Sequence, residues 1–221
     1  MTFLLVHGAW HGSWCWEQVA SRLAASGAAV RTVDLPSAGT PAGLHDDARA
    51  VRAAIDSLDG PVTVVAHSYG GQPVTEAAAG VDHIVYVAAF QLDEGDSVLG
   101  AIGGQPPSWW KVDGDFVTPL TPAEVFFNDI PDSADAVARL RPQSYASFTE
   151  PLAAAAWKTV PSTYVLCDKD NAIPVFAQEA MSQRSSRVER LSAGHSPFLS
   201  RPDELVRILL ESRTAAVRDP G

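Results

Sequence analysis

The fold is decided by the stretch VTVVAHSYGG at residues 62–71. A run of β-branched and small apolar residues leads directly into Ser68, and a helical pattern follows it. Ala66 and Gly70, two positions before and after the serine, are small enough to let neighbouring backbone pass closely, as a sharp strand-to-helix turn requires. Such a nucleophile elbow places the serine hydroxyl at the carboxyl edge of a sheet and at a helix N-terminus. The stretch therefore predicts Ser68 as a nucleophile.

Apolar runs and helical patterns alternate along most of the chain. The runs are short and rich in β-branched residues, which is typical of buried parallel strands. We expect strands at residues 2–6, 29–33, 62–66, 84–89, 162–166 and 188–191. We expect helices at residues 14–26, 44–58, 69–79, 175–184 and 202–213. This alternation predicts an α/β fold with a mostly parallel six-stranded sheet flanked by helices.

The alternation is interrupted between the fourth and fifth expected strands. Residues 92–160 are rich in proline and aromatic residues, and we interpret them as a small lid inserted over a pocket. Residues 1–91 and 161–221 would then form the core. Most aromatic side chains of the lid would pack it onto the sheet, and a minority would face a substrate. The side chains that we expect to line the pocket are Trp10, Trp109, Trp110, Phe126, Phe127 and Phe198.

A second motif, HGAWHG at residues 7–12, follows the first expected strand immediately. In a fold with a nucleophile elbow, this loop supplies an N–H group that stabilises the oxyanion of a tetrahedral intermediate. Gly8 allows the chain to approach closely, and we expect the Ala9 N–H as one donor. We expect the Tyr69 N–H, directly after the nucleophile, as the other. The alternative is an ordinary strand–helix turn with two histidines on the surface.

The base that activates Ser68 must be a histidine on a loop near the carboxyl edge of the sheet. His195, within the motif AGHSPF, follows the last expected strand and precedes the last helix. The chain order Ser, acid, His places the base there. His67 adjoins the serine but would point away from it at the elbow. Of the others, His45 lies in a helical stretch and His83 leads into a strand, so we expect His195 as the base.

The acidic member should follow the expected strand at 162–166, where Asp168 and Asp170 both lie in the sequence CDKDN. A carboxylate at the correct position would fix the tautomer of the imidazole and stabilise its charged form. Spacing alone does not choose between the two, and either could instead cap a helix or be solvated. A third possibility is the acidic group after the fourth strand, which comprises Asp93, Glu94 and Asp96.

Composition and charge exclude several function classes. The formal net charge of −10 and the lack of a basic run argue against a nucleic-acid partner. The sequence has no glycine-rich phosphate loop and no metal-ligand spacing, so we expect neither a cofactor nor a metal. It also has no long apolar window and no signal-peptide pattern, and Cys15 and Cys167 form no disulfide framework. We expect a cytoplasmic protein with a small-molecule substrate and no membrane partner, which could form a homodimer.

The opening LVHGAWHGSWCW at residues 5–16 resembles that of the plant methyl-esterase and hydroxynitrile-lyase family of α/β-hydrolases and of its bacterial relatives. The similarity continues at VAAF (87–90), YVLC (164–167) and GHSPF (194–198). It covers nearly the whole chain, with the lid as the least specific part. One departure is Ala66, where the family usually has glycine; alanine is the smallest substitute and keeps the turn feasible.

The resemblance implies an α/β-hydrolase fold and carries roles over one residue at a time. Ser68 matches the nucleophile and His195 matches the base. The family's acid falls on Asp170, two residues before an Ile-Pro pair. Ala9 and Tyr69 match the two oxyanion donors.

The implied function is that of a serine hydrolase, a carboxylesterase for small apolar esters that acts through a Ser-His-Asp triad and an acyl-enzyme. The alternatives are a cofactor-free lyase that cleaves a cyanohydrin, a biosynthetic cyclase that uses the same pocket, and a pure binding protein. The hydroxynitrile lyases carry a lysine directly after the catalytic histidine and a threonine after the first histidine of the opening. This chain has Ser196 and Gly8 at those positions, which favours ester hydrolysis. An intact triad argues against a binding protein, because a receptor would lose nothing without one.

Overall fold

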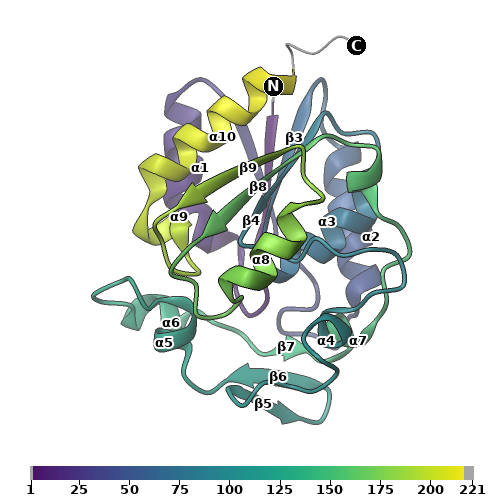
Figure 1. The fold of residues 1–221 in the computed structure, drawn as a ribbon, viewed down its shortest axis with the longest axis vertical. Helices are drawn as coiled ribbons and strands as arrows, with labels where there is room; N and C mark the ends of the chain where they lie inside the picture. The colour runs from purple at the N-terminus through teal and green to yellow at the C-terminus, as the bar shows by residue number, and fades with distance from the viewer. Residues whose placement is uncertain (1, 217–221) are drawn as a thin grey trace.

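A six-stranded parallel sheet forms the centre of the molecule (Figure 1) in a computed structural model that describes residues 2–216. Its spatial order is β2-β1-β3-β4-β8-β9, and each neighbouring pair is parallel. The prediction of six strands in a parallel α/β sheet is therefore confirmed. The strands are β1 (Thr2–Val6), β2 (Ala29–Val33), β3 (Val62–His67), β4 (His83–Val87), β8 (Ser162–Cys167) and β9 (Arg187–Leu191).

Alternate residues of each buried strand face opposite sides of the sheet, which creates two apolar cores. In β1, Leu4 and Val6 belong to the cluster on the side of α2, α3 and α8. Phe3 and Leu5 belong to the cluster on the side of α1 and α10. Because both faces of the sheet centre are covered, the strands β1, β3, β4 and β8 are buried along their whole length rather than alternating, whereas the edge strands β2 and β9 are partly exposed. Figure 1 shows the helices in these two layers.

The five predicted helices of the core are present in the predicted order, and the short helix α9 was not predicted. They are α1 (Glu17–Ala25), α2 (Leu44–Asp56), α3 (Gly71–Ala77), α8 (Val175–Ser182), α9 (Pro197–Ser200) and α10 (Pro202–Ala216). Two of them differ from the expected single helices, because each begins with a tight 3₁₀ turn, η1 (Ser13–Trp16) and η2 (Ser68–Gly70). Within residues 2–216, no helix combines the length and the apolar character needed to cross a bilayer.

Between β4 and β8 the chain forms a separate antiparallel sheet that the sequence did not predict. Its order is β5-β6-β7. The strands are β5 (Trp110–Asp113), β6 (Phe116–Pro119) and β7 (Gln143–Ser144). Strands of four and two residues are too short to give a periodic pattern. The short helices around them are α4 (Val98–Ala101), α5 (Pro122–Phe126), α6 (Ala134–Ala138), α7 (Ala146–Thr149) and η3 (Ala156–Lys158).

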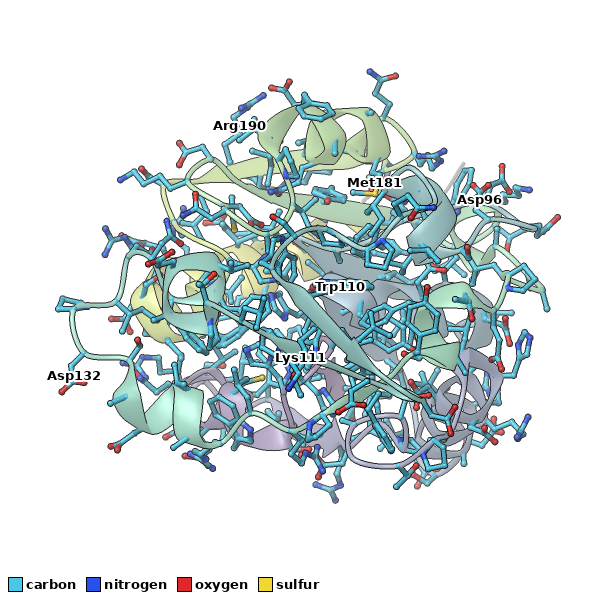
Figure 2. All side chains as sticks on the ribbon, turned by 90° about the horizontal axis from the view of Figure 1, so that it is seen from below. Asp96, Trp110, Lys111, Asp132, Met181 and Arg190 are labelled. Atoms are coloured by element: carbon cyan, nitrogen blue, oxygen red, sulfur yellow. The ribbon has the colours of Figure 1, made fainter. Side chains whose placement is uncertain are left out.

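Most of the inserted segment, residues 92–160, lies at the end of the parallel sheet drawn at the bottom of Figure 1, whereas η3 packs against α3 as the chain returns to the start of β8. Figure 2 looks at that end and shows β5 with Trp110 and Lys111 across the middle of the face. Successive strand residues point to opposite sides, so Trp110 is buried while Lys111 is exposed. β7 joins the insertion to the core, since the Ser144 N–H donates to the Ser37 carbonyl at 2.9 Å.

Candidate active site

Ser68 lies at the turn from β3 into η2 and has the positive φ of 52° that a sharp elbow requires. Such a φ is unfavourable for a residue with a side chain and persists only where the surroundings fix it. The neighbouring loop passes so closely that a Cβ atom on Gly8 would come within 2.8 Å of the Ser68 Cβ. A Cβ on Gly70 would collide with the His7 carbonyl. The small residues of both motifs are therefore explained by this close approach.

Three side chains from separate loops form a line of hydrogen bonds at the carboxyl edge of the sheet. His195 follows β9, and its Nε2 lies 3.0 Å from Ser68 Oγ. Its Nδ1 lies 2.8 Å from Asp170 Oδ2, in the loop after β8. Asp168 is exposed, whereas Asp170 is buried. The structure thus places Asp170, and not Asp168, against the histidine.

Four donors surround the Asp170 carboxylate. Its Oδ1 accepts the N–H groups of Ala172 and Ile173 at 2.7 and 3.0 Å. Its Oδ2 accepts the Gln178 side-chain amide at 3.0 Å in addition to His195. These bonds fix the direction in which Oδ2 meets the imidazole. Gln178, on α8, was missed by the sequence analysis because a glutamine within a helix carries no motif.

Asp93, Glu94 and Asp96, the third possibility for the acidic member, have other partners. Asp93 forms an ion pair with Lys158 at 2.6 Å, and Glu94 lies 3.5 Å from the same ammonium. The Asp96 carboxylate accepts the Asp93 N–H at 3.2 Å. These three carboxylates therefore stabilise their own turn and the end of the insertion.

The histidines near His195 are buried and uncharged. Burial lowers the pKa of His7 to about 4 and that of His11 to about 3, which contradicts the alternative of two surface histidines. Burial also holds the pKa of His67 well below its usual value. His67 donates from Nε2 to the His195 carbonyl at 2.8 Å. It thus supports the backbone of His195 without placing a positive charge beside the imidazole.

Two residues of the insertion hold the loops that carry the histidine and the carboxylate. Asp129 accepts the Gly194 N–H at 2.7 Å, and the Asn128 amide donates to the Lys169 carbonyl at 2.9 Å. A Cβ atom on Gly194 would collide with both of these side chains. No local pattern signals these contacts, because the partners lie 65 and 41 residues apart in the chain.

A cavity of about 390 Å³ opens beside Ser68 and His195. Ala9 and Tyr69, the expected oxyanion donors, lie in its wall. Most of the other lining residues are apolar or aromatic. Those predicted from the sequence that do line it are Trp10, Trp109, Trp110 and Phe126.

Phe127 and Phe198 do not line the cavity, which corrects the prediction for these two residues. Phe127 follows Phe126 at the end of α5, and its ring lies at 81° to that of its neighbour. It packs instead against His11, at 5.8 Å between ring centroids. Phe198 packs beneath the elbow, 4.9 Å from the His67 ring. Both side chains therefore support the site from behind.

The cavity wall is aromatic and carries few polar groups. Trp10 lies at its centre, with four aromatic rings between 5.3 and 5.7 Å from its own ring. Among the described residues that line the cavity, none is Lys, Arg, Asp or Glu, and the polar members are Ser68, Tyr69, Asn171 and His195. The wall is thus complementary to an uncharged and largely apolar molecule.

Comparison with known proteins identifies the family. Residues 3–208 match the alpha/beta hydrolase family. The chain belongs to this family. Methylesterase 7 of Arabidopsis thaliana is 29% identical over 95% of each chain. A carbendazim hydrolyzing esterase of Nocardioides sp. is 29% identical over 94% of this chain and 97% of the relative.

A solved structure of the methylesterase MES16 from Arabidopsis superposes with a TM-score of 0.80 at 26% identity, covering 97% of this chain and 99% of the other. The relatives of this alpha/beta hydrolase thus include plant methylesterases and a bacterial esterase, which confirms the resemblance seen in the sequence. The fold is the α/β-hydrolase fold, with the antiparallel insertion between the fourth and fifth strands of the parallel sheet.

Proposed function

We propose that this alpha/beta hydrolase is a serine carboxylesterase for small, uncharged, apolar esters. The observation that carries the proposal is the line of hydrogen bonds from Ser68 through His195 to Asp170 beside an aromatic cavity. A serine hydroxyl within reach of a histidine that is itself oriented by a carboxylate is the arrangement of an activated nucleophile. We also propose that the N–H groups of Ala9 and Tyr69 stabilise the oxyanion and that the reaction passes through an acyl-enzyme on Ser68.

The reaction would proceed in two halves. In the first half, His195 Nε2 accepts the Ser68 proton while Oγ attacks the ester carbonyl carbon, and the carbonyl oxygen becomes an oxyanion. The imidazolium then gives this proton to the alcohol oxygen as the carbon–oxygen bond breaks, which leaves an acyl-enzyme. In the second half, His195 takes a proton from water as the water oxygen attacks the acyl carbon, and the imidazolium then returns this proton to Ser68 Oγ as the bond between Oγ and the acyl carbon breaks and the carboxylic acid leaves. Asp170 holds the histidine tautomer throughout.

The two proposed oxyanion donors flank the nucleophile. Tyr69 follows it in η2, and the first N–H groups of a helix lack acceptors within the helix. Ala9 lies in the loop after β1, which adjoins β3 in the sheet. The close passage of Gly8 beside Ser68 brings this loop against the nucleophile. Two donors that converge on the developing charge are the main electrostatic contribution expected for acyl transfer.

The cavity suggests the substrate class. A charged acyl or alcohol group would lose its hydration without meeting an opposite charge, because none of the described lining residues is Lys, Arg, Asp or Glu. Apolar and aromatic esters would instead gain from contact with the tryptophan and phenylalanine rings. The names of the two relatives, a methylesterase and a carbendazim hydrolyzing esterase, are consistent with small esters. We propose that uncharged esters are preferred over esters with a free carboxylate.

Turnover of a panel of p-nitrophenyl and methyl esters tests the proposal, with Ser68→Ala as the paired variant. We expect the variant to fold normally and to lose about 10⁴- to 10⁶-fold in kcat, as the loss of a triad nucleophile does. Mandelonitrile, added to the same panel, tests for lyase chemistry. The three lysines lie away from the cavity wall, so cyanide should leave poorly. Ester turnover that survives Ser68→Ala, or cyanide release faster than ester hydrolysis, would overturn the proposal.

A further inference from the structure

A buried chain of hydrogen bonds joins the two loops that carry the proposed oxyanion donors. The Trp10 N–H donates to Gln143 Oε1 at 3.1 Å, and the Gln143 amide donates to Ser37 Oγ at 2.6 Å. The Ser37 hydroxyl donates to Asp47 Oδ2. From the other side, the Tyr69 hydroxyl donates to the same Asp47 oxygen at 2.6 Å. No member of the chain is more than 4% exposed.

The hydrogen bonds described above run in one direction from each end, and both series end at the Asp47 carboxylate. The Ser37 N–H adds a third bond, to Oδ1 at 2.9 Å, and the second amide hydrogen of Gln143 is taken by Ser147 Oγ at 2.8 Å. An ionised Asp47 carboxylate accepts the hydrogen bonds of all three partners at once. Burial raises the pKa of Asp47 to about 6, which leaves it ionised at neutral pH. A fully satisfied buried network of this kind specifies one arrangement.

The Trp10 end of the chain fixes the loop that contains Ala9. Trp10 has a φ of 63°, a conformation that is unfavourable for a residue with a side chain unless its surroundings impose it. Its carbonyl accepts the Arg141 N–H at 2.8 Å, and its indole donates to the Val117 carbonyl at 2.8 Å. Together with Gln143, these bonds hold the peptide that directly follows the Ala9 donor.

The Tyr69 end fixes the other donor. Tyr69 directly follows Ser68, and its side chain is 1% exposed. Its ring packs edge-on against Phe148, at 5.6 Å between centroids, and its hydroxyl is tied to Asp47 on α2. The packed ring and the buried bond to a carboxylate therefore restrain the backbone of Tyr69, including its N–H.

From this geometry we infer that Asp47 and Gln143 are positioning residues of the oxyanion hole, which keep the Ala9 and Tyr69 N–H groups aimed at one oxygen atom. The inference rests on the proposed function. A network that merely stabilised the fold would lower the free energy of unfolding when broken but would leave kcat unchanged. A network that aligns the donors acts only on the oxyanion, so its loss lowers kcat and leaves KM nearly unchanged.

Two variants test the inference. Asp47→Asn keeps the size of the side chain but replaces one acceptor oxygen by a donor, and Tyr69→Phe removes only the hydroxyl. The matched control is Tyr86→Phe, which also loses a buried hydroxyl bond, to Thr75 Oγ1 at 2.9 Å, but lies outside the cavity wall. Loss of a whole oxyanion donor costs about 10²–10³ in kcat. Misaligned donors should cost less, about 10- to 100-fold, with KM within about twofold. The control should keep its kcat within about twofold.

Binding of phenylboronic acid supplies a second readout, because boron forms a tetrahedral adduct with an active serine. Its affinity should fall in parallel with kcat in both variants. If either variant that folds keeps the wild-type kcat and boronate affinity, the inference is overturned. Should Asp47→Asn not fold, Tyr69→Phe decides alone. Failure of the proposed function would be visible separately, as ester turnover that is absent in the wild type or survives Ser68→Ala.

Discussion

The loops of the parallel sheet supply the atoms proposed to react, whereas the insertion at residues 92–160 supplies walls and supports around them. Ser68 and His195 follow β3 and β9, at the carboxyl edge where the parallel strands end together. Trp109 and Phe126 come from the insertion and face the cavity. The difference teaches that the atoms proposed to react come from the sheet loops alone, whereas the cavity wall is shared, since Trp10 comes from a sheet loop and Trp109 and Phe126 come from the insertion. Changes at the reacting residues or at their supports, such as Gln143, should act on kcat, and changes in the cavity wall should act on KM.

The largest expected effect concerns Asp170, the proposed acid in the loop after β8. Asp170→Asn should lower kcat by about 10³- to 10⁴-fold, because the amide favours the wrong tautomer of His195. Asp168→Asn, two residues away on an exposed side chain, is the matched control and should stay within about twofold of wild type. Steady-state hydrolysis of one p-nitrophenyl ester measures both. A greater loss in Asp168→Asn would mean that the catalytic carboxylate has been misassigned.

Acid should destabilise the core through its buried histidines. The pKa of His7 and that of His83 are lowered to about 4, that of His11 is lowered to about 3, and that of His67 also lies well below its usual value, all mainly by burial. Between about pH 6.5 and 4 the unfolded chain therefore binds more protons than the folded one. The free energy of unfolding falls as the pH falls through this window, by about 1.4 kcal/mol per pH unit for each histidine.

Asp47 acts in the opposite sense, because its raised pKa of about 6 makes the folded chain bind the extra proton between about pH 4 and 6. Asp47 offsets the effect of about one of the four histidines. The free energy of unfolding should therefore still fall by several kcal/mol between pH 6.5 and 4.5. Urea unfolding at a series of pH values measures it. His83→Gln, in β4, should reduce the slope by about one proton. A flat profile would show that these histidines are charged in the folded state.

In the insertion, Trp109→Ala should raise KM about tenfold for an aromatic ester and change kcat less than about threefold, because it removes one ring of the cavity wall. Trp157→Ala is the matched control. Trp157 is also a half-buried tryptophan of the insertion, but it donates to the Leu92 carbonyl at 2.8 Å and does not line the cavity. Its KM should remain unchanged. Equal effects of the two variants on KM would break the distinction between the cavity wall and the rest of the insertion.

The two regions also differ in how much of them the sequence could predict. The strands of the core and the serine elbow carry local signals, since a β-branched run, small residues around Ser68 and the turn glycines occur within ten residues. The contacts that support the site do not. Tyr69 meets Asp47 across 22 residues, and Gly194 meets Asp129 across 65. Only the fold brings these partners together, so no local pattern could indicate them.

The same limit explains the errors in the insertion. Phe126 and Phe127 are neighbours of the same residue type, yet the Phe126 ring lines the cavity and the Phe127 ring packs against His11. The sheet β5-β6-β7 escaped prediction because its strands are short and one of them ends at Pro119. Tertiary packing, rather than intrinsic preference, decides the conformation of such segments.

Labelling with a fluorophosphonate tests most directly whether Ser68 is the activated nucleophile. The reagent reacts with a serine only where a base and an oxyanion hole activate it. We expect one equivalent of label per chain, found by peptide mass mapping on the fragment that contains Ser68, with loss of ester turnover in proportion to labelling. The Ser68→Ala variant should take up no label. Label on another serine, or full turnover by a fully labelled protein, would contradict the account.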